Sequence, residues 1–362
     1  MKYLFILGRN PELSISELRA FFGELDYKKK ENAILVEFPG KLDLEIIKKL
    51  GGTISIGEVL ASGKIEEIEK QLEEKEIYFG KKNNFSFVLY DFSKDTEEIR
   101  EYLKKRFRKE KLKASEKRAK FMILQDGERG YYSSGLIEEQ YFMFDDYFGR
   151  IVEECNYDEI EKRDMGKPVR REQLAISPRL AKIMINLSQV KENEILLDPF
   201  CGIGVILQEA LIQRKNVIGI DNNAQTIEDA RKNLEWGKYS ERRYKLIVDD
   251  SRTVELSDKI HVIVTEPELG KILKKTPNIY EIQKMQRGFE KLMIEVLKHL
   301  KKSVNGRVIF TAPFVKLNKG DRIGCSIKNI LEDTGLKLVR GFPIADFREE
   351  QIVGRQIFVL ER

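Results

Sequence analysis

Cysteine and histidine are scarce in this sequence. Cys155, Cys201 and Cys325 are its three cysteines, and they form no CxxC pair. A disulfide framework and a cysteine-based zinc site are therefore excluded as organising features. His261 and His299 are the only histidines, so neither a Ser-His-Asp triad nor a metal site is predicted. This cysteine usage is typical of a reducing compartment, and we expect a cytoplasmic protein.

Long apolar runs are also missing. No stretch approaches the roughly 20 apolar residues that cross a bilayer as a helix, so no association with a membrane is expected. The first seven residues, MKYLFIL, indicate a strand that leads into polar sequence rather than a signal peptide. The hydrophobic share of 41% over 362 residues is enough for genuine cores. This length favours two or three domains.

Positive charge is concentrated in one segment. The net charge of +5 is modest, but the segment KKRFRKEKLKASEKRAK (104–120) holds ten basic residues against two acids. Two interpretations are open, a solvated helix face in a Lys/Glu-rich protein or a phosphate-binding surface. We favour the second. The predicted phosphate contacts are Lys104, Lys105, Arg106, Arg108, Lys109, Lys111, Lys113, Lys117 and Arg118.

The first 145 residues indicate two small α+β units. Residues 1–60 hold strand-like segments around a helix that a capping box of Ser14 and Glu17 is predicted to open. Residues 61–145 continue with a charged helix, a strand and a further helix through the basic segment. Residues 146–175 lack clear periodicity and are predicted to be a linker.

Strands alternate with helices from residue 176 to residue 362. The predicted strands are Ile195–Asp198, Asn216–Asp221, Lys245–Val248, His261–Thr265 and Arg307–Thr311. The predicted helices are Val205–Ile212, Ala224–Trp236, Tyr280–Leu300 and Ser326–Thr334. Such alternation indicates an α/β fold with a parallel, doubly wound, Rossmann-like sheet. The segments Lys337–Phe342 and Gln356–Glu361 are predicted to add a C-terminal antiparallel hairpin.

A short glycine turn follows the first of these strands. In DPFCGIG, Gly202 and Gly204 allow the backbone to approach a ligand at the carboxyl edge of the sheet, where doubly wound folds bind their ligands. Leu207 occupies the place of the third glycine in a dinucleotide fingerprint. The carboxylate of Asp198 beside the turn would repel a pyrophosphate, but it suits the ammonium group of a methionine moiety.

Further acids end the next two strands. Asp221 ends the second strand, 23 residues after Asp198, where an acid accepts hydrogen bonds from ribose hydroxyls. Asp249 and Asp250 end the third strand, where a carboxylate accepts the adenine amine, and we favour Asp250. Together these acids predict S-adenosyl-L-methionine as the cofactor. The predicted cofactor-binding residues are Pro178, Asp198, Pro199, Phe200, Cys201, Gly202, Gly204, Asp221, Asn222, Asp249, Asp250 and Glu266.

Several motifs together resemble one known family. They are DPFCGIG, the strand end VTEPELG, the dipeptide Arg163–Asp164, a proline flanked by basic residues in 167–171, and a Pro-x-Leu-Ala helix start at 178–181. This combination is similar to the THUMP-associated tRNA guanosine N2-methyltransferases, of the kind that modifies guanosine 10 of tRNA. The resemblance is specific over residues 155–270 and weaker over the first 145 residues.

The resemblance implies a domain organisation and a partner. It implies an N-terminal ferredoxin-like domain over 1–60, a THUMP-like RNA-binding domain over 61–145, and a Rossmann-like methyltransferase domain over 176–362. The implied partner is tRNA, bound by the basic segment together with Arg170 and Arg171. A requirement for a small activator subunit, known for some relatives, is left open.

The loop VTEPELG departs from the family's catalytic pattern. The resemblance implies that Glu266 keeps the acceptor for the target amine and that Pro267 keeps one rigid carbonyl. Glu268 replaces a second proline, and Leu269 replaces an aromatic that stacks on the flipped base. Phe314 is expected to supply a ring in its place. A glutamate accepts both N1–H and N2–H of guanine, whereas it would repel N1 of adenine.

The sequence therefore predicts S-adenosylmethionine-dependent methyl transfer to the N2 amine of a tRNA guanosine. One alternative is a methyltransferase that acts on another RNA or DNA amine. Another is an inactive RNA-binding relative that keeps the cofactor fold as a scaffold. The intact acids of the cofactor pocket argue against loss of activity. The modified nucleotide and the number of methyl groups do not follow from the sequence.

Overall fold

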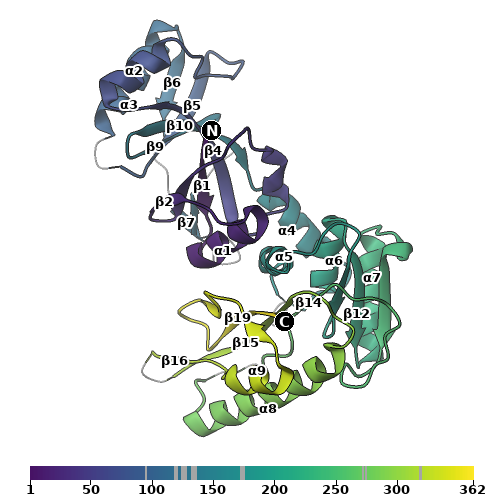
Figure 1. Ribbon diagram of the computed structural model, residues 1–362. Helices are drawn as coiled ribbons and strands as arrows, with labels where there is room; N and C mark the ends of the chain where they lie inside the picture. The colour runs from purple at the N-terminus through teal and green to yellow at the C-terminus, as the bar shows by residue number, and fades with distance from the viewer. Residues whose placement is uncertain are drawn as a thin grey trace. The chain divides into compact units, whose positions relative to one another are not determined.

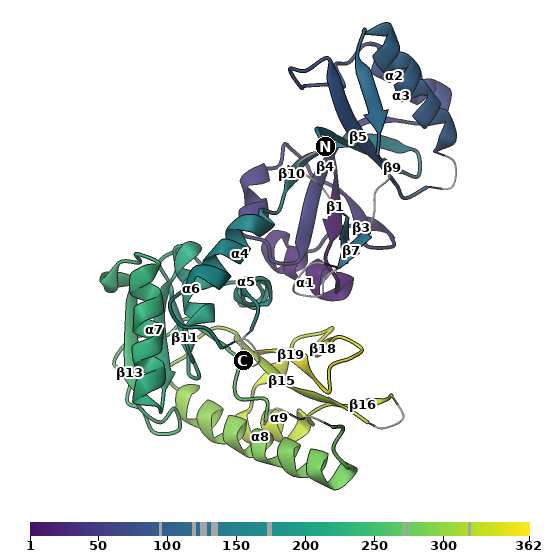
Figure 2. The same cartoon turned by 180° about the vertical axis from the view of Figure 1, so that it is seen from behind.

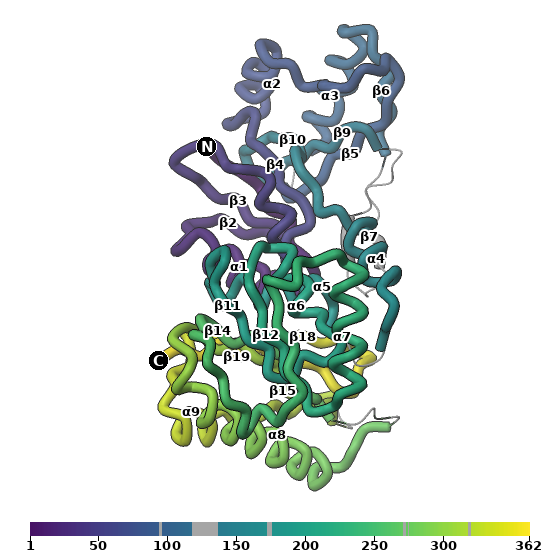
Figure 3. Tube along the Cα trace, turned by 90° about the vertical axis from the view of Figure 1, so that its right-hand side faces the viewer, coloured from purple at the N-terminus to yellow at the C-terminus, as the bar shows by residue number. Residues whose placement is uncertain are grey.

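A computed structural model gives the fold of the chain (Figure 1). It describes residues 1–93, 96–117, 121–123, 129–131, 137–171, 176–270, 273, 275–317 and 320–362, which are coloured in Figure 3, with backbone alone for 121–123 and 129–131. The predicted phosphate contact Arg118 lies outside the described residues. The chain divides into two compact units, 1–15 with 22–156 and 16–21 with 157–362. No helix in the described ranges is long and apolar enough to cross a membrane.

The first unit is built on one large sheet. Its strands are β1 (Lys2–Leu7), β2 (Tyr27–Lys30), β3 (Ala33–Glu37), β4 (Thr53–Ser62), β5 (Asn84–Asp91), β6 (Lys113–Glu116), β9 (Glu139–Phe144) and β10 (Tyr147–Glu154). They form an eight-stranded sheet in the order β2-β3-β1-β4-β10-β9-β5-β6. A separate ribbon pairs β7 (Phe121–Ile123) with β8 (Arg129–Tyr131). Its helical segments are the 3-10 helix η1 (Leu44–Lys48), α2 (Ile65–Glu73) and α3 (Glu97–Lys109). Helix α1 (Pro11–Phe22) is divided, because its residues 16–21 group with the second unit.

Helices α2 and α3 lie side by side on this sheet (Figures 1 and 3). Each presents its apolar side to the strands, Ile68 and Leu72 from α2, and Leu103 and Phe107 from α3. These side chains pack against aromatic residues of the strands, and Phe107 makes an edge-on contact with Phe87 at a centroid distance of 5.5 Å. Both the strands and helix α3 therefore contribute aromatic side chains to this core, and α2 and α3 add aliphatic ones.

The segment predicted as a linker over 146–175 contains a strand, β10, and a helix, α4 (Tyr157–Gly166). Residues 147–154 form β10, which pairs antiparallel with both β4 and β9. The register of β10 against β4 shifts twice, after Phe148 and after Ile151. Such bulges break the alternation of inward and outward side chains, which explains why the sequence shows no period there. Through β10 the strands of residues 1–60 and 61–145 join in one sheet.

The sequence predicted one helix through the basic segment, and this prediction is wrong. Helix α3 ends at Lys109, Lys111 takes a positive φ of 60°, and β6 follows at residues 113–116. β6 pairs parallel with the buried strand β5, in register from Asn84 with Lys113. Tertiary pairing therefore outweighs the helix propensity of this lysine-rich sequence.

The first helix begins earlier than the predicted capping box. Helix α1 starts at Pro11, and the Asn10 side chain accepts the backbone N–H of Leu13 at 3.2 Å. Ser14 lies inside the helix and donates its hydroxyl to the Asn10 carbonyl at 2.9 Å. Asn-Pro is itself a strong start signal, because proline suits the first helical position and asparagine the cap.

The second unit carries a mostly parallel sheet. Its strands are β11 (Ile195–Asp198), β12 (Asn216–Asp221), β13 (Tyr244–Val248), β14 (Val262–Thr265), β15 (Val308–Lys316), β16 (Arg322–Ile323), β17 (Lys337–Leu338), β18 (Ile344–Asp346) and β19 (Val353–Glu361). The main order is β13-β12-β11-β14-β15-β19-β17. Strands β11 to β15 are parallel, and β19 is antiparallel to both its neighbours. The predicted doubly wound sheet is thus found. The C-terminal antiparallel pair is also present, but its first strand is Lys337–Leu338 and not the predicted Lys337–Phe342.

Helices cover both faces of this sheet (Figures 1 and 2). They are α4 (Tyr157–Gly166), α5 (Pro178–Leu187), α6 (Val205–Ile212), α7 (Ala224–Trp236), α8 (Ile279–Leu300) and α9 (Lys328–Thr334), with the 3-10 helix η2 (Glu241–Arg243). Helices α8 and α9 pack on one face through a cluster that includes Phe289, Met293 and Ile330. Helices α5, α6 and α7 contact the strands from the other face. The chain order reverses between β11 and β14, where doubly wound folds bind ligands.

Strand β15 continues past the end of its parallel neighbour. Thr265, the last residue of β14, pairs with Phe310, and β15 runs on to Lys316. Over this second half β15 pairs with β19 and β16, and β19 also pairs with β18. These strands form an antiparallel extension, residues 311–316, 322–323, 344–346 and 353–357, beyond the carboxyl edge of the parallel strands.

Candidate active site

The glycine turn after β11 has the conformation of a ligand cradle. Gly202 and Gly204 have φ angles of +52° and +85°, and Gly204 caps the start of α6. These values lie in the left-handed region that favours glycine. A Cβ added to Gly202 would meet no atom within 4 Å, so the turn faces open space. Behind the turn, the Cys201 N–H donates to the Ile220 carbonyl at 2.9 Å and ties it to β12.

The acids at the ends of β12 and β13 differ in their surroundings. Asp221 is half-buried, and its Oδ1 accepts the N–H of Asn223 at 2.9 Å. Its Oδ2 has no hydrogen bond from the described residues and can accept one from a ligand. Asp250 is paired with Arg252, whose Nη2 lies 2.5 Å from Oδ2. This hydrogen bond lowers the pKa of Asp250 to about 2. Asp249 is exposed. The open glycine turn and the Oδ2 atom of Asp221, which can accept ribose hydroxyls, both fit S-adenosyl-L-methionine.

Asp198 is more deeply buried than the sequence indicates. It is 1% exposed, and its Oδ1 accepts the Thr265 hydroxyl at 2.6 Å and the Phe200 N–H at 3.1 Å. Burial raises the pKa of Asp198 to about 7, against the two hydrogen bonds, which favour the charged form. A contact to the methionine ammonium therefore has to use Oδ2, and this role of Asp198 stays a prediction.

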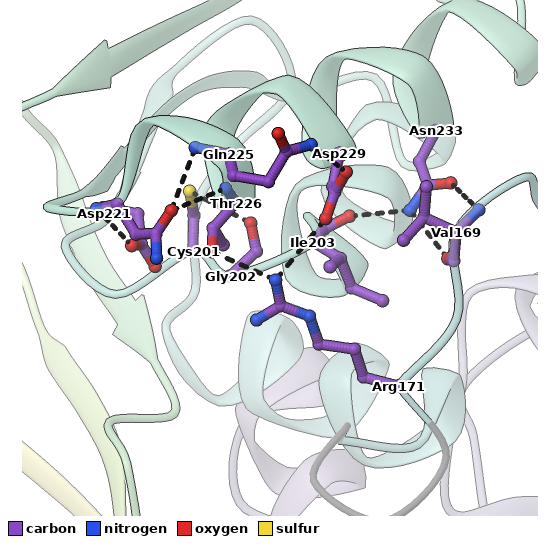
Figure 4. Close-up of polar contacts among 11 residues, drawn as sticks. Val169, Arg171, Cys201, Gly202, Ile203, Asp221, Gln225, Thr226, Asp229 and Asn233 are labelled. Atoms are coloured by element: carbon purple, nitrogen blue, oxygen red, sulfur yellow. Dashed lines mark hydrogen bonds and ion pairs between the residues drawn. The ribbon is translucent and has the colours of Figure 1, made fainter.

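The segment before α5 is attached to the cofactor side of the unit (Figure 4). The fully buried Asn233 of α7 accepts the N–H of Val169 at 3.0 Å and donates to the carbonyls of Val169 and Ile203 at 3.1 and 3.0 Å. One side chain thus links this segment to the glycine turn. Arg171, predicted to contact RNA, donates to the Thr226 hydroxyl at 3.0 Å and is 43% exposed.

The predicted catalytic loop begins one residue after the Thr265–Asp198 bond. The Glu266 side chain is 9% exposed, and its Oε1 accepts Nε of Arg355 at 2.5 Å and the hydroxyl of Thr311 at 3.2 Å. Its Oε2 accepts Nη2 of Arg355 at 3.2 Å. Arg355 and Thr311 were not singled out in the sequence, since neither belongs to a motif. An arginine inside the apolar strand pattern VGRQIFVLE was the one signal available.

The remaining loop residues face different surroundings. Pro267 is buried and Glu268 is exposed. Leu269 packs against the apolar core of the second unit, as Phe200 does. Phe314 was expected to supply a stacking ring beside the loop. It lies three residues after Thr311, on the opposite face of β15 by strand alternation, and contacts Phe347 at a centroid distance of 5.5 Å. The structure therefore does not support that expectation.

The predicted phosphate contacts lie in the first unit and are not equivalent. The Arg106 guanidinium donates to the carbonyls of Leu72 and Lys75 at 3.0 and 3.3 Å, and its side chain is 11% exposed. Lys104 pairs with Glu116 at 3.6 Å. Both residues are thus engaged within the unit. Lys109 pairs with Glu73 at its surface, and the other exposed contacts are Lys105, Arg108, Lys111, Lys113 and Lys117.

A glycine turn at a switch point, acids at successive strand ends and a seven-stranded main order define a Rossmann-like methyltransferase. Two families match the chain, the RMKL-like methyltransferase domain over residues 167–311 and a DNA methylase family over residues 27–232. The second match spans more than half of the chain, so the chain belongs to that methylase family. The methyltransferase-domain match and the methyltransferase relatives described next imply S-adenosyl-L-methionine as the cofactor, as the sequence predicted.

The curated relatives confirm the resemblance noted in the sequence. The chain is 41% identical over 96 residues to the tRNA (guanine(10)-N2)-dimethyltransferase of Methanothermobacter thermautotrophicus, which covers 26% of this chain and 28% of the relative. It is 32% identical over 142 residues to the enzyme of that name from Methanocaldococcus jannaschii, over 38% and 37% of the two chains. It is 26% identical to the Pyrococcus abyssi enzyme over 75% and 78%. The first two matches thus span less than half of those relatives.

Solved structures share the fold. The crystal structure of TrmN from Thermus thermophilus aligns with a TM-score of 0.53 at 15% identity and covers all of both chains. A possible methylase from Clostridium difficile 630 aligns with a TM-score of 0.50 at 15% identity, over 100% of this chain and 98% of that chain. At this level of identity the likeness concerns the fold alone.

The raised pKa of Asp198 predicts a pH-dependent stability. The unfolded carboxyl has a pKa near 3.9, so its contribution is complete below about pH 4 and is lost as the pH rises through about 7. Asp198→Asn removes this loss. The difference in free energy of unfolding between Asp198→Asn and wild type should therefore shift in favour of the variant, by at most about 4 kcal/mol between pH 4 and pH 8. Urea unfolding followed by Trp236, the single tryptophan, measures this in the second unit.

The exposed acid Asp158 of α4 provides the matched control for Asp198. Asp158→Asn should differ from wild type by a nearly constant amount over the same pH range. If the difference between Asp198→Asn and wild type is also constant with pH, the buried carboxyl does not titrate in this range and the assignment is wrong.

The Asn233 anchor predicts a large loss of stability on truncation. Asn233→Ala leaves the N–H and carbonyl of Val169 and the carbonyl of Ile203 without this partner. Each buried unpaired group costs roughly 1–3 kcal/mol, so we expect a loss of about 3 kcal/mol or more in urea unfolding. Lys232→Ala, on the exposed side of the same helix, should change stability by less than about 0.5 kcal/mol. Equal stability of the two variants would contradict the anchor.

Proposed function

We propose that this chain is a cytoplasmic tRNA methyltransferase that transfers a methyl group from S-adenosyl-L-methionine to the exocyclic N2 amine of a guanosine. The one observation that carries the proposal is the Thr265–Asp198 hydrogen bond of 2.6 Å. It holds the start of the glycine turn beside the residue that precedes Glu266. A cofactor on the turn and an amine held by Glu266 would therefore be neighbours. The names of the curated relatives support guanosine N2 in tRNA as the target.

The cofactor-binding residues have distinct tasks in this proposal. Gly202 and Gly204 would let the cofactor lie against the turn backbone, and Asp221 would accept the ribose hydroxyls through Oδ2. Asp249, which is exposed and next to the Arg252-paired Asp250, is then the better acceptor for the adenine amine, although the sequence favoured Asp250. The bound cofactor supplies a sulfonium methyl group as the electrophile.

The loop residues would orient the target amine. The Oε2 atom of Glu266 has room for one further hydrogen bond, because a carboxylate oxygen accepts about two and Arg355 supplies one. An N–H of the amine bound there, together with the carbonyl of Pro267, would direct the nitrogen lone pair toward the methyl group. Such positioning accounts for much of the rate enhancement in bimolecular transfers. Glu266 takes one guanine N–H in this arrangement, rather than the two that the sequence suggested.

The first unit would bind the tRNA. We assign the ferredoxin-like domain to residues 1–60 and the THUMP-like domain to residues 61–145, joined through β10 in one sheet. Support comes from the resemblance and from the exposed cations at the end of α3 and on β6. Arg170 and Arg171, which precede α5 in the second unit, would add contacts to the same tRNA. A small activator subunit is compatible with this assignment.

A DNA amine is the second candidate target. The match of residues 27–232 to a DNA methylase family favours it. The two targets are separated by incubating the protein with labelled S-adenosyl-L-methionine and either bulk tRNA or duplex DNA, followed by nucleoside analysis. N2-methylated guanosine from tRNA supports the proposal, and a methylated DNA base alone would replace it.

The role proposed for Glu266 predicts how variants of this residue behave in the same assay. Glu266→Ala should lower kcat by at least about 100-fold, because the amine loses its acceptor, while the cofactor Kd stays near that of wild type. Glu266→Gln, which keeps one acceptor oxygen, should retain more activity. Glu255→Ala, an exposed acid of the same unit, is the control. Wild-type turnover by Glu266→Ala would remove Glu266 from the site.

The basic segment predicts two separable effects. Replacing the exposed Lys105, Arg108, Lys111 and Lys113 by alanine should weaken tRNA binding and flatten its salt dependence, by roughly 0.7–0.9 in the log–log slope for each lost phosphate contact. Arg106→Ala should instead lower the stability of the first unit, because its guanidinium holds two backbone carbonyls. An unchanged salt slope in the fourfold variant would show that the segment is a solvated surface.

A further inference from the structure

Arg355 joins the antiparallel extension to the predicted catalytic loop. It lies on β19, at the position that pairs with Pro313 of β15 on one side and with Asp346 of β18 on the other. Its guanidinium reaches Glu266, at the end of β14, through Nε at 2.5 Å and Nη2 at 3.2 Å. The contact thus crosses β15 and ends on the loop itself.

The Arg355–Glu266 pair is mostly buried, and Asp346 is a second carboxylate that acts on Arg355. The side chains of Arg355 and Glu266 are 18% and 9% exposed, and Asp346 is 9% exposed. Burial acts against the charge of Arg355, but the carboxylates of Glu266 and Asp346 outweigh it and raise its pKa. Arg355 therefore stays a cation at any physiological pH and keeps the two donors that bind Glu266, Nε and Nη2.

The two-point contact fixes the plane of the Glu266 carboxylate. An arginine fork that binds both oxygens leaves the carboxylate no freedom to rotate. The Thr311 hydroxyl takes the second acceptor direction of Oε1 at 3.2 Å. Among the described residues, the acceptor direction that remains is on Oε2. The contacts therefore select one oxygen of Glu266 for a further donor.

We propose that Arg355 is a positioning residue for methyl transfer, which holds the Glu266 carboxylate so that its Oε2 accepts one N–H of the target amine. This role rests on the proposed function. Arg355 acts through Glu266 and need not touch the substrate. It also neutralises one negative charge beside Asp198 and Glu268, where a polyanionic RNA has to approach.

A purely structural ion pair is the competing explanation. A buried pair of this kind contributes little net stability compared with apolar residues of similar volume. Here one partner lies on a loop at the carboxyl edge rather than on the strand beside it. The two explanations differ in what they predict for kcat when the fold is intact.

A double-mutant cycle of Arg355 and Glu266 tests the role. Arg355→Met should lower kcat for tRNA methylation by about 100-fold, the scale expected for a misplaced catalytic contact, with the cofactor Kd unchanged. Arg355→Lys keeps the charge but not the fork, and it should recover part of this loss. In the Glu266→Gln background, Arg355→Met should cost little more, because the residue it positions is already altered. Arg340→Met, an exposed arginine of the same unit, is the control.

An NMR signal reports on the Arg355–Glu266 pair and does not depend on catalytic activity. The Arg355 Nε–H resonance should be shifted downfield and slow to exchange in wild type, and both properties should be lost in Glu266→Gln. If Arg355→Met does not fold, Arg355→Lys and the double variant, which removes the unpaired carboxylate charge, carry the test.

The outcomes separate this role from the proposed function. An active wild type with a fully active, folded Arg355→Met overturns the role of Arg355 alone. Additive losses in the double variant, or an ordinary Nε–H signal in wild type, also overturn it. A wild type that binds the cofactor but methylates no tRNA overturns the proposed function, and the role of Arg355 with it.

Discussion

The hydrogen bond from Thr265 to Asp198 joins the two strand ends between which the sheet order reverses. The backbone ladder between β11 and β14 ends earlier, with Leu197 opposite Ile263. Beyond that point the side-chain hydrogen bond of 2.6 Å links the two strands. It costs a buried carboxylate whose pKa is raised to about 7. A functional reason is the simplest account, since the glycine turn and the EPEL loop both begin at this bond.

Charged pairs connect the neighbouring segments to the same framework. Arg163 of α4 donates to the buried Glu209 of α6 at 3.0 Å, and Arg355 of β19 binds Glu266. The first pair joins α4 to α6, the helix that follows the glycine turn, and the second joins β19 to the loop after β14. Buried pairs contribute little net stability but strongly disfavour arrangements that separate the partners. They therefore define where α4 and the extension lie within the second unit.

The sequence predicted those parts whose signals are local. The bounds of β11, α6, β12 and α7 coincide with prediction, because glycine, asparagine and the apolar period mark each end within a few residues. Bulges hid β10, and pairing with β5 turned residues 113–116 of the basic segment into β6. At the site, Arg355 lies 89 residues after Glu266 with no motif around it. Only the folded sheet brings that pair together, and the burial of Asp198 has the same origin.

The unusual loop is better explained as an altered site than as a decayed one. A loop without function has no reason to keep a carboxylate 9% exposed and bound by an arginine fork and a hydroxyl. The departures from the family pattern also have separate physical accounts. Glu266 binds a cation from the extension, Arg355. Leu269 packs into the core, whereas the aromatic of the family pattern would stack on a base. The stacking surface for the base then has to come from elsewhere, while the acceptor for its amine is retained and held more rigidly.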